Sequence, residues 1–264
     1  MNFLHTYNPE PIALAIGSLD ISWYGIFVAL AVFIGFFIVN KLAKDKDSSI
    51  TSNHIIDLIM LFIIAGVVGG RIGHIIGDWE YYVDHLNEII KIWQGGLAVH
   101  GVIVADLIAA IFYSRWKKIS FWQITDLFVV IIPLMQSIVR WGNYFNQEIY
   151  GWPTSLPWGI PIDARYRLEG YLNDTYFHPV FLYESILMLG LFFIMLYLFK
   201  KKSFKVGMLT IIYFISFGVI RFALDFFKID IIQIGPLLLT QWVSIIIVIF
   251  GIFGLYKLIV KFSK

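Results

Sequence analysis

The sequence predicts an all-α integral membrane protein with seven transmembrane helices. Hydrophobic residues make up 59% of the 264 residues and charged residues only 14%, whereas soluble domains carry about 25% charged residues. The mean hydropathy is +0.79. Apolar runs recur along the whole chain, and basic residues gather in alternate connections between them. Together these three observations favour a multi-pass membrane protein over a soluble one.

Seven apolar segments approach the roughly 20 residues that a helix needs to cross a bilayer core of about 30 Å. They are Leu19–Asn40, Ile55–Gly77, Leu97–Tyr113, Phe121–Val139, Pro179–Phe199, Val206–Phe226 and Leu237–Ile259. The third is the shortest and has glycines beside it. No basic region precedes the first, so we expect a retained span and not a cleaved signal peptide. We expect one polytopic membrane domain over residues 1–264.

The distribution of basic residues predicts the orientation. Thirteen of the twenty Lys and Arg residues lie in alternate connections and at the C-terminus: Lys41, Lys44, Lys46, Arg115, Lys117, Lys118, Lys200, Lys201, Lys202, Lys205, Lys257, Lys261 and Lys264. The positive-inside rule then places the N-terminus outside and the C-terminus in the cytoplasm. Two connections on the outer side are long, Asp78–Gly96 and residues 140–178. We expect the second to form a small extracytoplasmic cap.

Polar side chains near the ends of the apolar segments share one predicted depth, close to the outer surface. They are Tyr24, Arg71, His100, Arg140, His178, Glu184, Arg221 and Asp225. Ionisable groups in hydrocarbon are costly and usually functional. Structural readings stay open for each one: Arg71 could extend to the headgroups, and Arg221 and Asp225, four residues apart, could form an ion pair. The shared depth favours a single site.

The residue types at this depth suit a phospholipid headgroup. Arg71, Arg140 and Arg221 supply guanidiniums, which bind phosphate in a bidentate manner. His100 is a candidate general base, and the glycines around it allow a substrate or a backbone to approach closely. The chain has no cysteine and no HExxH pattern, and its carboxylates are scattered. We therefore expect no metal, no cofactor and no nucleic-acid partner.

Six motifs resemble those of the prolipoprotein diacylglyceryl transferases. "RWGNYFNQE" places Arg140, Gly142, Asn143, Asn146 and Glu148 on the most specific signature of that family. "WYG", "GGRIG", "WQGGLAVHG", "HPVFLYES" and "GVIRFALDFF" resemble its other landmarks, in family order. The resemblance covers nearly the whole chain.

The resemblance implies an enzyme of the bacterial cytoplasmic membrane whose active site faces the outer leaflet. Such an enzyme moves the sn-1,2-diacylglyceryl group from phosphatidylglycerol to the lipobox cysteine of a preprolipoprotein signal peptide, forms a thioether and releases glycerol phosphate. The implied catalytic residues are His100, Arg140 and Arg221. The implied lipid-binding residues are Tyr24, Arg71, Arg140, Gly142, Asn143, Asn146, Glu148 and Arg221. The implied supporting residues are Gly96, Gly101, His178, Tyr183, Glu184 and Asp225.

Five positions depart from the family pattern. His74, Val102, Val139, Phe217 and Asp225 stand where the family commonly has Tyr, Gly, Gly, Tyr and Glu. Phe217 removes a hydroxyl near the predicted phosphate site, and Asp225 is one methylene shorter than the usual acid. These changes suggest a divergent paralogue.

Two other functions stay open. One is a family member that binds lipid or lipoprotein without catalysis. The other is a small-molecule transporter, which needs polar residues through the full membrane depth. The inner halves of the predicted spans carry only isolated acids, Asp57, Asp106 and Asp126, which disfavours transport.

Overall fold

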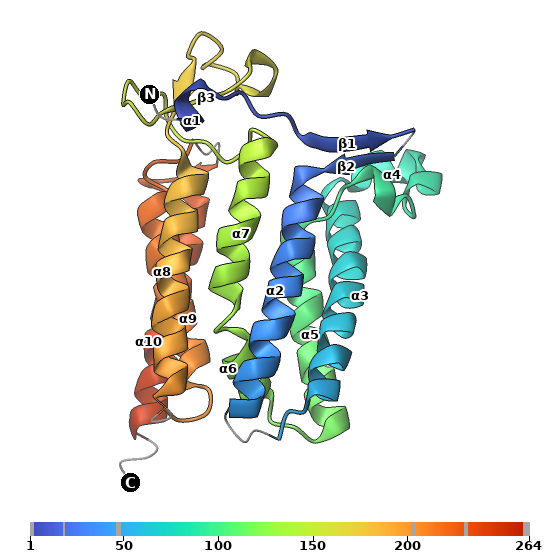
Figure 1. Cartoon of the computed structure of the whole chain (residues 1–264), viewed down its shortest axis with the longest axis vertical. Coiled ribbons are helices and arrows are strands. Elements are labelled where there is room, and N and C mark those ends of the chain that lie inside the picture. Colours follow the sequence, from blue (N-terminus) through green and yellow to red (C-terminus); the bar gives the residue numbers. More distant parts are fainter. Residues whose placement is uncertain (1–2, 18, 46–48, 202–203, 230–231, 261–264) are drawn as a thin grey trace. The chain divides into compact units, whose positions relative to one another are not determined.

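A computed structural model describes residues 3–17, 19–45, 49–201, 204–229 and 232–260. Four of the basic residues used to predict the orientation lie outside these ranges: Lys46, Lys202, Lys261 and Lys264. The described chain is mostly helical, with three short antiparallel hairpins (Figure 1).

The α-helices are α1 (Phe3–Thr6), α2 (Trp23–Asp45), α3 (Ser52–Gly77), α4 (Trp79–Asp84), α5 (Val99–Lys117), α6 (Phe121–Phe128), α7 (Ile132–Phe145), α8 (Val180–Lys200), α9 (Met208–Leu224) and α10 (Leu239–Val260). Single 3₁₀ turns occupy Leu86–Glu88, Ile92–Gln94 and Ala164–Tyr166. The hairpins pair β1 (Ile12–Ile16) with β2 (Leu19–Ser22), β3 (Ile160–Pro161) with β4 (Tyr176–Phe177), and β5 (Gln233–Ile234) with β6 (Leu237–Leu238).

The helices are those of a multi-pass membrane protein. Within the described ranges, α2, α3, α5, α8 and α10 are each long and apolar enough to cross a bilayer. The α6–α7 pair, bent by 47°, makes a sixth candidate if it counts as one span. Helix α9 is apolar but has only 17 residues, so the seventh predicted span stays a prediction.

The fourth predicted segment, Phe121–Val139, differs most from expectation. It breaks between α6 and α7, where Pro133 lies in the first turn of the new helix. Proline has no backbone N–H to donate, so it interrupts the hydrogen bonds of an incoming helix and is tolerated in the first turn of a new one. Helix α7 then continues to Phe145, six residues past the predicted end. Arg140 and Asn143 are therefore helical, and the connection to α8 begins only at Asn146.

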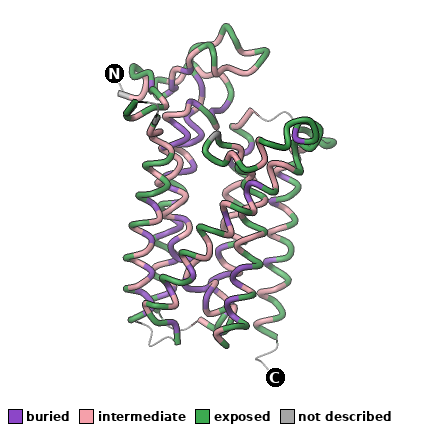
Figure 2. The backbone as a smooth tube through the Cα atoms, turned by 90° about the vertical axis from the view of Figure 1, so that its right-hand side faces the viewer, coloured by how far each residue is buried: buried purple, intermediate pink, exposed green. Residues whose placement is uncertain are grey.

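Close contacts divide the chain into two compact units, described separately here. Unit 1 comprises Met1–Phe37 and Phe128–Lys264, and unit 2 comprises Ile38–Leu127. In unit 1, α7 packs on α8, α8 on α9, and α9 on α10. Figure 2 shows how buried, intermediate and exposed residues alternate along the helices. Helix α8 is the most buried of the long apolar helices and α10 is the least. This exposure suits a helix that faces lipid.

The connection between α7 and α8 folds over an aromatic and aliphatic cluster. Its buried members are Tyr144, Tyr150, Ile160, Ile162, Phe177 and Phe181. The Tyr150 hydroxyl accepts from the Leu168 amide and donates to the Tyr166 carbonyl, both at 2.8 Å. Burial raises the pKa of Tyr150. The cluster anchors this segment to the ends of α7 and α8 that carry Tyr144 and Phe181.

Unit 2 is built on the close packing of α3 and α5. A Cβ atom added to Gly69 would collide with the Gly101 backbone, and one added to Gly101 would collide with the Gly69 backbone. The Ala98 amide donates to the Gly70 carbonyl at 2.9 Å. Small residues allow membrane helices to approach to backbone contact. The close approach predicted at Gly101 is thus made by backbone.

Candidate functional site

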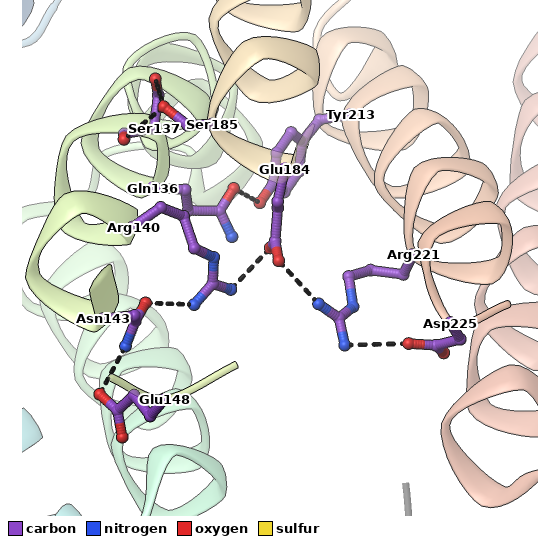
Figure 3. A network of polar contacts seen from close by, with 10 residues as sticks. All are labelled: Gln136, Ser137, Arg140, Asn143, Glu148, Glu184, Ser185, Tyr213, Arg221 and Asp225. Atoms are coloured by element: carbon purple, nitrogen blue, oxygen red, sulfur yellow. Dashed lines mark hydrogen bonds and ion pairs between the residues drawn. The ribbon is translucent and has the colours of Figure 1, made fainter. Parts of the chain in front are cut away.

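Glu184 bridges two arginines inside unit 1 (Figure 3). Its side chain is fully buried on α8. The Arg140 Nη2 atom on α7 donates to Oε1 at 2.6 Å, and the Arg221 Nη1 atom on α9 donates to Oε2 at 2.9 Å. Three helices therefore converge on one carboxylate. The predicted association of Arg140 and Arg221 at one level is confirmed within this unit.

A second layer of partners orients the two guanidiniums. The Arg140 Nη1 atom donates to Asn143 Oδ1 at 2.9 Å, and Arg221 Nη2 donates to Asp225 Oδ1 at 3.2 Å. The ion pair predicted from the four-residue spacing of Arg221 and Asp225 is confirmed. The shorter acid at position 225 still reaches its partner.

The signature "RWGNYFNQE" continues this network to the surface. Asn143 Nδ2 and Asn146 Nδ2 both donate to Glu148 Oε1, at 2.8 and 3.1 Å. Helix α7 ends beside them because Gln147 and Ile149 adopt left-handed φ angles of 55° and 57°, which a helix cannot continue. The turn brings the exposed Glu148 back onto the two asparagines.

Gly142 brings Tyr24 to the same site. A Cβ atom at position 142 would lie 2.9 Å from the Tyr24 Cα, a distance that would force the helices apart. The absence of a side chain at Gly142 therefore allows α2 to pack directly on α7.

The charges of Arg140, Arg221, Glu184 and Asp225 balance, yet one donor has no partner among the described residues. Two guanidiniums face the two buried carboxylates of Glu184 and Asp225. Among the described residues, the buried Arg140 Nε has no hydrogen-bond acceptor, and Asp225 Oδ2 has no donor. An unpaired buried donor is unfavourable and calls for a partner. The Arg140 Nε is thus a donor that the described part of the chain leaves without a partner.

Comparison with known proteins assigns this arrangement to a family. A family model described as prolipoprotein diacylglyceryl transferase matches residues 11–257. The chain belongs to the prolipoprotein diacylglyceryl transferase family. The resemblance of its motifs to that family is confirmed.

Curated relatives carry the name phosphatidylglycerol–prolipoprotein diacylglyceryl transferase. One from Thermosynechococcus vestitus is 35% identical over 246 residues, covering 93% of this chain and 91% of the relative. Another from Acaryochloris marina is 38% identical over 249 residues, covering 94% and 90%. A third from Finegoldia magna is 38% identical over 243 residues, covering 92% and 93%. The similarity thus extends over nearly the full length of each family member.

Arg71 uses its guanidinium differently from the two arginines of unit 1. It is only 7% exposed. Its Nε donates to Ile89 O at 2.8 Å, its Nη1 to Gly95 O and Gly96 O at 2.9 and 3.2 Å, and its Nη2 to Glu88 O at 2.5 Å. The open reading that Arg71 extends to the headgroups is wrong, because the side chain turns onto the backbone before α5. Its lipid contact stays a prediction, and its geometry favours a scaffold role.

His100 lies in unit 2, in the first turn of α5, and it is exposed. Gly96, four residues earlier, has a φ angle of 74°, and a Cβ atom there would meet the Arg71 Nη1 and the His74 ring. The segment before His100 is thus fixed by Arg71. The role of His100 as a base stays a prediction.

His178 and Tyr183 form a separate cluster at the start of α8. The Tyr183 hydroxyl accepts from Trp158 Nε1 at 2.9 Å and lies 3.1 Å from His178 Nδ1. The predicted helix start after His178–Pro179 is confirmed, since α8 begins at Val180. Burial lowers the pKa of His178. This cluster fastens the connection to α8 and does not contact Glu184 through any of these bonds.

Three hydrogen bonds of buried side chains were not anticipated from the sequence. The Gln147 side chain is 3% exposed; its Nε2 donates to Pro9 O at 2.9 Å, and its Oε1 accepts from the Asp163 amide at 2.7 Å. The Tyr213 hydroxyl donates to Gln136 Oε1 at 3.3 Å. The sequence feature that could have pointed to the last of these bonds is Gln136, a polar residue inside a predicted apolar segment.

Proposed function

We propose that this chain transfers the sn-1,2-diacylglyceryl group from phosphatidylglycerol to the lipobox cysteine of preprolipoprotein signal peptides. The products are a thioether-linked diacylglyceryl peptide and glycerol phosphate. The observation that carries the proposal is the Arg140–Glu184–Arg221 bridge with its unpaired Arg140 Nε, in a chain of the transferase family.

Two guanidiniums suit this reaction because the leaving group is a phosphate. The sulfur of the lipobox cysteine loses its proton and forms a bond to the glyceryl carbon. The bond between that carbon and the phosphate oxygen breaks, and its electrons leave with glycerol phosphate. Arg140 and Arg221 oppose the charge that develops on the phosphate, and groups already held in place do so most effectively. The nucleophile belongs to the peptide substrate, so the enzyme needs no cysteine.

The other signature residues have binding roles in this proposal. Asn143, Asn146 and Glu148 orient the polar headgroup and the Arg140 guanidinium, and Tyr24 lines the site. His100 takes the thiol proton, a role that suits an imidazole near neutral pH. Arg71 maintains the segment that leads to His100.

We propose that the protein crosses the bacterial cytoplasmic membrane seven times, with α6–α7 as one bent span and α9 as the short seventh. The positive-inside rule places the N-terminus and the site outside, because basic residues follow the C-terminal ends of α2, α5, α8 and α10. The connection between α7 and α8 is then an extracytoplasmic cap, and the site opens toward the outer leaflet.

The test is turnover by the purified chain in lipid nanodiscs that contain phosphatidylglycerol. A lipobox peptide should gain the mass of a diacylglyceryl group, and glycerol phosphate should appear in equal amount. A peptide with serine in place of the lipobox cysteine is the matched control and should stay unmodified. Folded protein that binds phosphatidylglycerol but yields no product contradicts the proposal and supports the non-catalytic alternative.

A further inference from the structure

A second polar layer lies beside the Glu184 bridge, further along the helices of unit 1. Tyr213 on α9 is 5% exposed, and its hydroxyl donates to Gln136 Oε1 on α7 at 3.3 Å (Figure 3). Gln136 precedes Arg140 by about one helical turn, and Tyr213 precedes Arg221 by about two. The bond therefore joins the two helices that carry the arginines.

The same layer also ties α7 to α8. Ser185 Oγ donates to the Ser137 carbonyl at 2.9 Å, and the two hydroxyl oxygens lie 3.0 Å apart. Ser185 follows Glu184 directly, and Ser137 follows Gln136. Helix α7 is thus fastened to both of its functional neighbours by residues adjacent to the ion network.

Packing alone does not explain this layer. Polar groups inside an apolar bundle are unfavourable unless they find partners, and hydrogen bonds between membrane helices contribute specificity as well as attraction. Apolar side chains of similar size would fill the same space. The Tyr213 ring is also held by stacking on Phe217, with the ring centres 5.9 Å apart.

We propose that Gln136 and Tyr213 are positioning residues for the transfer reaction. They fix the rotation of α7 and α9 at which Arg140 and Arg221 both reach Glu184, and they contact no substrate themselves. A guanidinium that is displaced by a small helix rotation loses its alignment with the leaving phosphate. This inference rests on the proposed transferase function.

The test uses Tyr213→Phe, Gln136→Met and the double variant, with Tyr197→Phe as matched control. Tyr197 is 64% exposed on α8 and has the same hydroxyl to lose. We expect each single variant to lower kcat about fivefold, as the loss of one buried hydrogen bond predicts. KM for phosphatidylglycerol should change less than kcat, and the double variant should be no slower than the slower single variant.

Three results overturn the inference. One is a Tyr213→Phe rate equal to that of Tyr197→Phe. Another is a double variant whose loss is the product of the two single losses, because independent residues act additively in free energy. The third is a lowered Tm with unchanged kcat, which indicates a purely structural bond.

The failure of the proposed function gives a different pattern. If the parent chain is folded and has no turnover, the transferase proposal fails. The positioning role is then decided by Tm in a double-mutant cycle of Tyr213→Phe with Glu184→Gln. Tm shifts that are not additive support the positioning role, and additive Tm shifts overturn it.

Discussion

The two units use arginine in opposite ways. Arg71 in unit 2 gives its Nε, Nη1 and Nη2 atoms to backbone carbonyls of the segment before α5. Arg140 and Arg221 in unit 1 share one buried carboxylate, and Arg140 keeps an unpaired Nε. The same residue type, buried as Arg71 and half-buried as Arg140 and Arg221, thus serves as scaffold in one unit and as candidate ligand site in the other.

The difference lies in the partners. Carbonyl oxygens accept four hydrogen bonds from the Arg71 guanidinium and hold the segment before α5 in place. Carboxylates balance the charge with fewer bonds, and among the described residues they leave the Arg140 Nε without an acceptor. Residue type alone does not separate these cases, whereas the set of hydrogen bonds that each guanidinium makes does.

The strongest test of the comparison is Arg221→Lys. Lysine keeps the charge but loses the planar fork that reaches Glu184 and Asp225 together. We expect transfer to fall about 100-fold, the scale of losing one aligned donor at the developing charge, with the protein still inserted and folded. Arg140→Ala should act similarly. Steady-state rates and Tm measure both effects, and parental turnover in Arg221→Lys refutes the phosphate role of that residue.

Removing the shared carboxylate is the next largest change. Glu184→Gln keeps the shape of the side chain but removes its charge. One buried carboxylate, that of Asp225, then remains to balance the two guanidiniums. Breaking a buried ion pair typically costs about 3 kcal/mol of stability, so we expect a clear fall in Tm and a rate lowered about tenfold, roughly the effect of 1.4 kcal/mol. Glu184→Asp, which keeps the charge, is the control. Equal Tm for Glu184→Gln and the parent refutes the bridge as a stabilising element.

Arg71→Lys tests the other side of the comparison. Lysine has one side-chain nitrogen where arginine has three that donate to backbone carbonyls. Residues 86–97 should therefore lose order, while the hydrogen bonds around Glu184 in unit 1 stay intact. We expect amide exchange in this segment to rise and the rate to fall less than tenfold, because each lost hydrogen bond contributes about 1 kcal/mol. A rate loss as large as that of Arg221→Lys, with unchanged exchange, places Arg71 in the lipid site and ends the contrast.

The smallest expected effect is a gain. Phe217 lies one helical turn from Arg221 and stacks on Tyr213. A hydroxyl introduced by Phe217→Tyr adds one donor near the guanidiniums, and we expect the rate to rise about threefold, within the range of one neutral hydrogen bond. Steady-state kinetics with phosphatidylglycerol as the varied substrate measures it. A slower variant indicates that the added hydroxyl disrupts the stacking.

The fold could be predicted where local pattern decides it. Apolar length located the long helices, and the four-residue spacing of Arg221 and Asp225 predicted their ion pair. The break before α7 was missed because the apolar run continues across it, although Pro133 marked the restart. The left-handed turn at Gln147 was missed because glutamine rarely adopts it.

The site was only partly predictable because its bonds join distant segments. Depth alone grouped Arg71 with Arg140 and Arg221, yet their partners differ. The bridge through Glu184 depends on how three helices pack, and no local pattern encodes that packing. Gln136 and Tyr213 were missed for the same reason, since they lie 77 positions apart in the sequence.

The two parts of the chain that form unit 1 are synthesised at different times. Its first part ends at Phe37 and its second begins at Phe128, so the whole of unit 2 is translated between them. At about 5–20 residues per second, Tyr24 leaves the ribosome many seconds before Gly142, the residue whose missing side chain accommodates it. The start of α2 is therefore synthesised before the residue that it packs against. The site can be assembled only after the second half of the chain has been synthesised.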